Sequence, residues 1–121
     1  MSNPKDTVWY LRVEQDHTPG VIVLTVSGRV SHKTSPEFGA ALASALDAME
    51  AVVLDLSGVD YISSAGLRAI GHASRRLAER DRRFVVCGLR DPVSVALTLA
   101  GLAASVAIEP SRELAIARAR I

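Results

Sequence analysis

A pair of serines near the middle of the chain, Ser63 and Ser64, combines a residue type and a position that could support chemistry. The pair follows a short apolar stretch and precedes Ala65-Gly66, after which apolar residues recur at the spacing of a helix that buries one face. Unpaired backbone N–H groups and the positive end of the helix dipole would therefore point toward the serines. A phosphoryl group would be stabilised there, whereas the plain structural alternative is a serine that only caps the helix.

The remaining polar side chains offer weaker candidates. Asp55 ends an apolar run, a place where open α/β sheets bind ligands, although a turn-capping carboxylate is the more common finding there. Cys87 lies inside another apolar run and is interpreted as a small core residue without a redox role. His17, His32 and His72 lack the spacing of metal ligands. With no phosphate-binding glycine loop and no G-x-S-x-G motif, we expect no catalytic residue, no metal site and no cofactor.

The elements that would position the serine pair alternate between strands and helices. Strands are expected where short apolar runs end in turn residues, and helices where apolar residues recur at i, i+3 and i+4. The expected strands cover residues 8–14, 21–26, 52–56, 84–87 and 105–108, and the expected helices cover residues 36–49, 64–80, 91–100 and 112–120.

The character of these strands predicts the fold class. Apolar runs without alternation are typical of parallel strands buried on both faces, and strands that alternate with helices are joined by right-handed crossovers. The four-residue turn at 17–20 instead predicts an antiparallel pair at the edge. We therefore expect an α/β fold with a mixed, mostly parallel sheet of four to five strands, an antiparallel edge strand and about four helices.

Local signals refine this expectation. Ser57-Gly58 should end the central strand, Ser35 should N-cap the first helix, and Gly101 should stop the third. The residues expected to face inward from the third and fourth helices are Val93, Leu97 and Ala100, and Leu114, Ile116 and Ala117.

Length and composition limit the class of protein. The 121 residues suit one domain, 1–121, with residues 1–6 frayed, and 49% hydrophobic but only 4% aromatic residues predict an aliphatic core. A net charge of +1 gives no overall attraction for nucleic acid or an anionic membrane. With no signal-peptide pattern and no apolar run near the ~18 residues of a membrane span, we expect a soluble cytoplasmic protein.

The run D-L-S-G-V-D-Y-I-S-S-A-G-L-R, residues 55–68, resembles the signature of STAS domains, in particular the bacterial anti-sigma factor antagonists. The resemblance covers most of the chain, from about Val8 onward. In that family the loop before the helix reads Asp-Ser-Ser-Gly-Leu or a close variant, and its first serine is the phosphoacceptor. Alignment on Gly66-Leu67 places the acceptor at Ser64, with Ser63 where the family has an acid and Ala65 where it has a second serine.

The resemblance implies a regulatory role without catalysis. The protein would bind an anti-sigma factor with serine-kinase activity and release a sigma factor, and phosphorylation of Ser64 from ATP would switch it off. The family commonly has an acid where Ser31 follows Gly28-Arg29-Val30, so the kinase would recognise a less acidic patch. The residues expected to bind the partner are Arg29, Ser31, His32, Ser63, Ser64, Gly66, Arg68 and His72.

Two other classes of function remain open from the sequence. STAS domains also occur as accessory subunits of transporters or in other signalling complexes, which would contact a partner without turnover of Ser64. A nucleotide-binding protein or small enzyme would need polar groups that this sequence does not supply. The expected oligomeric state is a monomer or a weak dimer.

Overall fold

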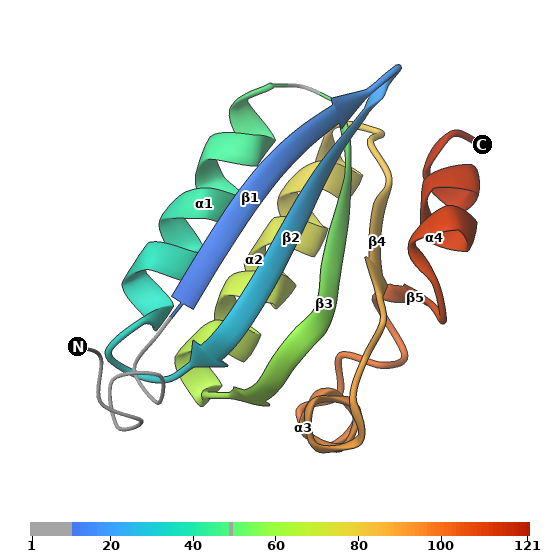
Figure 1. Cartoon of the computed structure of the whole chain (residues 1–121). Helices are drawn as coiled ribbons and strands as arrows, with labels where there is room; N and C mark the ends of the chain where they lie inside the picture. Colours follow the sequence, from blue (N-terminus) through green and yellow to red (C-terminus); the bar gives the residue numbers. More distant parts are fainter. Residues whose placement is uncertain (1–10, 49) are drawn as a thin grey trace.

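The computed structural model describes residues 11–48 and 50–121, which form a five-stranded sheet with four helices (Figure 1). The strands lie in the order β1-β2-β3-β4-β5; β1 pairs antiparallel with β2, and every other pair is parallel. The predicted fold class is therefore confirmed. The strand bounds are β1 Leu11–Thr18, β2 Val21–Val30, β3 Ala51–Ile62, β4 Phe84–Cys87 and β5 Ala107–Glu109.

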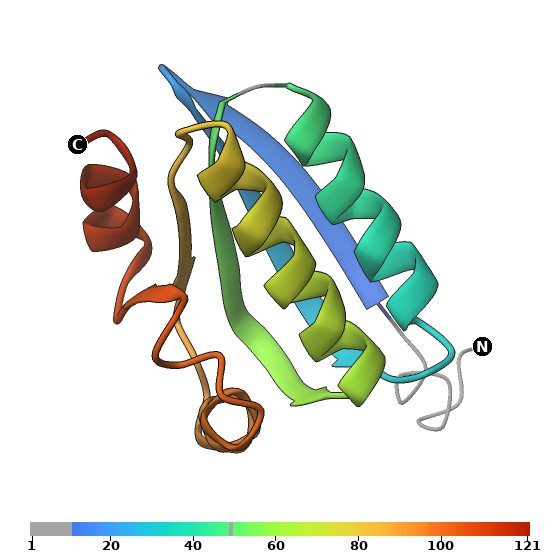
Figure 2. The ribbon, with the colours of Figure 1, turned by 180° about the vertical axis from the view of Figure 1, so that it is seen from behind.

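The helices cover the two faces of the sheet unequally. Helices α1 (Ser35–Asp47) and α2 (Ser64–Glu79) lie side by side on one face (Figure 2), and α4 (Arg112–Ala119) packs on the other face against β3 and β4. Helix α3 (Asp91–Leu99) lies near one end of the sheet, where it contacts β3. The sheet therefore has a main core under α1 and α2 and a smaller core under α4.

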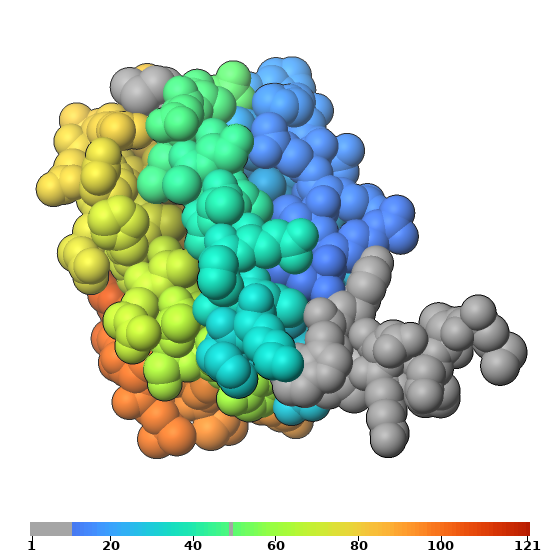
Figure 3. Space-filling model, turned by 90° about the vertical axis from the view of Figure 1, so that its left-hand side faces the viewer, coloured from blue at the N-terminus to red at the C-terminus, as the bar shows by residue number. Residues whose placement is uncertain are grey.

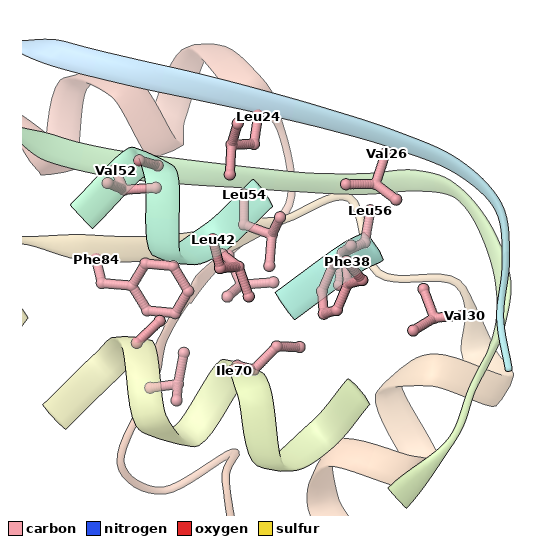
Figure 4. Packing of buried hydrophobic residues seen from close by; sticks show 14 of the residues in the cluster. Leu24, Val26, Val30, Phe38, Leu42, Val52, Leu54, Leu56, Ile70 and Phe84 are labelled. Atoms are coloured by element: carbon pink, nitrogen blue, oxygen red, sulfur yellow. The ribbon is translucent and has the colours of Figure 1, made fainter. Parts of the chain in front are cut away.

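The main core is aliphatic, as the composition predicts. Fully buried side chains from β2 and β3 point toward α1 and α2, and Phe38 of α1 packs among them (Figure 4). Burial of each such side chain contributes about 1.5–3 kcal/mol relative to leaving it in water. Because α2 is fixed along its buried face by Ile70, Ala73 and Leu77, its first turn has a defined position relative to the ends of β2 and β3.

The first three strands extend further than the sequence indicated. His17 and Thr18 belong to β1 instead of a turn, β2 continues to Val30, and the prediction that Ser57-Gly58 ends the central strand is wrong. At Gly58 an added Cβ would lie 2.8 Å from the Ser27 Cβ, so glycine permits a close approach of β2 and β3 at an irregularity in their register. Residues 8–10 of the predicted first strand lie outside the described residues.

Several helix predictions also require correction. Thr34, not Ser35, precedes the first residue of α1, and no side chain caps that helix. Ala100 is exposed, although the predicted stop of α3 at Gly101 is confirmed by a positive φ of 78°. In α4 the buried residues are Ala115 and Ala119. Of the residues expected to face inward from α4, Ile116 is half-buried, and Leu114 and Ala117 are exposed.

Some elements begin or end at other residues than the sequence predicted. Strand β5 spans only Ala107–Glu109, so Ser105 and Val106 lie before it. Helix α2 begins at Ser64 as expected and ends one residue early, at Glu79. The predicted last residue of α1, Met49, is not among the described residues.

Candidate functional site

The two serines at the start of α2 occupy different environments. Ser63 is the N-cap residue: its backbone is extended, with φ −80° and ψ 167°, and its Oγ accepts a hydrogen bond from the Gly66 N–H at 3.2 Å. Its own N–H donates to the Val30 carbonyl at 2.7 Å, which joins the start of α2 to the end of β2. The Ser63 side chain is buried, with 8% of the residue exposed, so its hydroxyl serves the helix.

Ser64 is the first residue of α2 and is exposed. Within residues 11–48 and 50–121 its hydroxyl has no hydrogen-bond partner, because the capping bond belongs to Ser63. An exposed hydroxyl at the positive end of a 16-residue helix can accept a phosphoryl group without any loss of an internal contact. The plain structural alternative from the sequence, a capping serine, thus applies to Ser63 and not to Ser64.

Gly66 allows the first turn of α2 to lie directly on the sheet. An added Cβ would lie 2.7 Å from Val30 Cγ1 and 2.8 Å from Ile62 Cγ1, both at the ends of strands. The residue is buried, so it shapes the site from beneath and presents no surface of its own.

The loop between β2 and α1 is held by its own polar side chains. The Ser31 N–H donates to Thr34 Oγ1 at 2.8 Å, and the Thr34 hydroxyl donates to the Arg29 carbonyl at 2.6 Å. Ser31 is buried, and its Oγ accepts from the Lys33 N–H at 3.2 Å. His32, in contrast, is exposed at the surface of this loop.

The strand ends next to this loop carry a cation and an aromatic ring in contact. The Arg29 guanidinium carbon lies 4.6 Å from the centroid of the Tyr61 ring, and the two residues are paired in the register of β2 and β3. Tyr61 is partly exposed, so this cation–π contact forms part of the surface near the start of α2.

A groove runs along the outer side of α2, with a volume of about 490 Å³. Arg68 and His72, predicted from the sequence, both line it and are exposed, and Ser64 lies at one end. The sequence reasoning missed the opposite wall, which comes from the residues after α3. The complete lining is Ser64, Leu67, Arg68, Gly71, His72, Arg75, Ala100 and Leu102.

One sequence signal could have indicated this groove. Gly71 lies in the middle of α2, where glycine costs about 1 kcal/mol relative to alanine. An added Cβ would lie 3.3 Å from Leu102 Cδ2, so the glycine marks the close approach of the segment after α3.

Asp55 is not part of this surface. Its carboxylate accepts the Ser57 N–H at 3.0 Å and pairs with Arg112 of α4, whose Nη2 lies 3.0 Å from Oδ2. Burial alone would raise the pKa of the Asp55 carboxyl, but the hydrogen bonds from Ser57 and the Arg112 guanidinium outweigh burial and hold the pKa below its ordinary value. Asp55 therefore lies inside β3, where it binds the Ser57 N–H and anchors α4, and does not cap a turn at a strand end.

Cys87 is buried on the same face, and burial, followed by the nearby Asp55 charge, raises the pKa of its thiol to about 12. Its placement matches the predicted core role.

No group of His, Cys, Asp and Glu among the described residues could hold a metal ion. In the part of the chain that the structure describes, no helix has the length and apolar character needed to span a bilayer.

Fold and site together define a small α/β domain with a mostly parallel sheet and an exposed serine at the start of its second helix. The chain belongs to the STAS domain family, whose sequence model matches residues 12–115. The family predicted from the sequence is therefore confirmed.

Relatives with similar sequences carry related names. The chain is 32% identical over 108 residues to BtrV of Bordetella bronchiseptica, named as an anti-sigma factor antagonist, with 88% of this chain and 93% of BtrV covered. It is 28% identical over 94 residues to an anti-sigma F factor antagonist of Paenibacillus polymyxa, covering 76% and 80% of the two chains. The crystal structure of an anti-sigma factor antagonist from Mycobacterium paratuberculosis has the same fold, with a TM-score of 0.87, 24% identity and full coverage of both chains.

Proposed function

We propose that this protein is an anti-sigma factor antagonist that phosphorylation of Ser64 switches off. Its partner is an anti-sigma factor with serine-kinase activity, and binding of that partner frees a sigma factor in the cytoplasm. The names of the two relatives support the antagonist role. The observation that carries the switch is the division of roles at the start of α2, where Ser63 caps the helix and Ser64 is left exposed.

The proposed binding surface lies around the exposed end of α2. Arg29, His32, Ser64, Arg68 and His72 would contact the partner directly, since all of them have accessible surface. The three buried residues of the predicted set, Ser31, Ser63 and Gly66, would act by holding the loop and the helix start in place.

Phosphorylation would act locally. A phosphoserine adds about −1.5 to −2 charges, which the helix dipole stabilises in the free domain. In the complex the same charge would have to be desolvated against a partner surface that fits a neutral hydroxyl, which weakens binding. No refolding of the domain is required for this effect.

The experiment is incubation of the protein with the serine-kinase anti-sigma factor of the same organism and ATP, followed by mass spectrometry. We expect one phosphoryl group, on Ser64, in the wild type and in Ser63→Ala, and none in Ser64→Ala. Modification of Ser63 with Ser64 untouched would contradict the assignment. Tight binding of a partner with no phosphorylation would instead favour an accessory subunit of a transporter or of another signalling complex.

A further inference from the structure

The groove beside Ser64 carries positive charge without negative charge. Its lining contains the two cations Arg68 and Arg75, with the polar His72 between them in sequence, and no aspartate or glutamate. Within residues 11–48 and 50–121, Arg68 and Arg75 have neither an ion pair nor a hydrogen bond from the side chain. Arg76 does not line this groove; it lines the hollow between α1 and α2, which Arg68 and His72 also border, and its Nε is 3.9 Å from Glu79 Oε1.

The opposite side of the groove is apolar. Leu102 and Ala100 line it, and the preceding residue Leu99 is 83% exposed. An added Cβ on Gly71 would lie 3.3 Å from Leu102 Cδ2 and 3.7 Å from Arg75 Nη1. The Arg75 guanidinium and the apolar wall of the groove are therefore close together. Figure 3 shows the yellow-green surface of α2 next to the orange surface of α3 and the segment that follows it.

We infer that this groove binds a segment of the anti-sigma factor in which a carboxylate side chain lies beside an apolar one. The carboxylate would pair with Arg68 and Arg75, for which guanidinium geometry is well suited. The apolar side chain would cover Leu102 and Ala100 and remove them from water. This inference rests on the proposed function, since it specifies the chemistry of the same partner at the same end of α2.

The position of Ser64 then gives phosphorylation a second effect. Ser64 and Arg68 are i and i+4 in α2, so their Cβ atoms are about 5–6 Å apart on the helix surface. A phosphate on Ser64 can therefore pair with Arg68 of its own chain and compete with the carboxylate of the partner. Arg75 is eleven residues along α2, a rise of about 16 Å, so the phosphate does not reach it from Ser64.

The first test needs no kinase or partner. Protein made with phosphoserine at position 64 is titrated by ³¹P NMR, which reports the second pKa of the phosphate, near 6 in an unperturbed phosphoserine. We expect Arg68→Gln to raise this pKa by about 0.5 and the matched control Arg75→Gln to leave it unchanged. A pKa that responds equally to both substitutions, or to neither, overturns the pairing of phosphate with Arg68.

The second test is calorimetric binding of the unmodified variants to the anti-sigma factor used in the kinase experiment. Arg68→Gln and Arg75→Gln should each weaken binding by about 2- to 10-fold, whereas Arg76→Gln should leave it unchanged. Phosphoserine at position 64 should also weaken binding less in Arg68→Gln than in the wild type, because the competition for Arg68 is absent.

The outcomes separate this inference from the proposed function. If phosphoserine 64 blocks binding but Arg75→Gln binds as well as the wild type, the acidic segment in the groove is wrong and the switch stands. If the wild type neither binds the anti-sigma factor nor is phosphorylated by it, the proposed function is wrong, and with it the partner segment assigned to the groove.

Discussion

The Ser63 Oγ accepts a hydrogen bond from the Gly66 N–H at 3.2 Å, so the first serine of the pair caps α2 while its neighbour remains exposed. This relationship predicts that two adjacent serines differ in their effect on stability. Ser63→Ala should lower the free energy of unfolding by about 0.5–2 kcal/mol, because an N-cap bond is lost, and Ser64→Ala should change it by less than about 0.5 kcal/mol.

Denaturant titration measures the free energy of unfolding of the two variants. The slope of this free energy against denaturant concentration should be the same in both if each unfolds in two states. The reverse order, with Ser64→Ala the less stable variant, would assign the capping bond to Ser64. The Ser64 hydroxyl would then be engaged in the helix cap and would not be free to accept a phosphoryl group.

Two glycines in neighbouring helices should respond in opposite ways to alanine. At Gly66 the new Cβ would lie 2.7 Å from Val30 Cγ1, so Gly66→Ala should destabilise the domain by about 1–3 kcal/mol through overpacking. At Gly39 in α1 the nearest atom is Ala69 Cβ at 4.0 Å, so Gly39→Ala should stabilise the domain by up to about 1 kcal/mol. Thermal melts of the two variants test this, and a neutral Gly66→Ala would mean that α2 can shift away from the sheet without cost.

The sequence predicted the order of elements because the strands are short apolar runs that end in turn residues, whereas the helices repeat apolar residues at i, i+3 and i+4. It failed at the strand ends, because Ser57-Gly58 has the composition of a turn and only the pairing with Ser27 explains its place inside β3. The inward face of α4 was also misplaced. Its alanines, Ala115 and Ala119, are buried against the sheet while Leu114 stays exposed, a choice set by tertiary packing and not by hydrophobicity alone.

The candidate site was predicted in part for a similar reason. The serine pair and the exposed residues Arg68 and His72 follow from local spacing in one helix. The wall formed by Ala100 and Leu102 comes from a distant segment, so no local pattern contains it. Which serine caps the helix depends on backbone angles, and the order of two identical residues does not reveal them.

The pairing of Asp55 with Arg112 should make stability depend on pH. Because the folded pKa of Asp55 lies below the ordinary value near 4, its contribution is present above about pH 4 and is lost as the pH falls below that value. At pH 7 Asp55→Asn should cost about 1–3 kcal/mol by leaving the Arg112 guanidinium without its charged partner.

The measurement is the difference in free energy of unfolding between wild type and Asp55→Asn from pH 7 to pH 2.5. We expect this difference to shrink below pH 4. Glu109→Gln is the control, because its pair with Arg118 is more exposed and should contribute at most about 1 kcal/mol. A difference that stays constant down to pH 2.5 would show that the Asp55 charge does not stabilise the fold.

A negative charge at Ser64 should separate folding from binding. Ser64→Asp places a carboxylate in the first turn of α2, which contains no acidic residue, so the helix dipole should stabilise the variant by roughly 0.3–1 kcal/mol. In the complex the same charge must be buried against a surface adapted to a hydroxyl, at a cost of about 2–5 kcal/mol, or ~30-fold or more in affinity.

The control Ser44→Asp adds the same charge at an exposed position of α1 and should leave affinity unchanged. Calorimetric affinity for the anti-sigma factor beside a thermal melt gives both quantities. If Ser64→Asp binds as tightly as the wild type and Ser44→Asp, added charge at this helix start does not control binding, and the phosphoswitch is excluded while the STAS fold is unaffected.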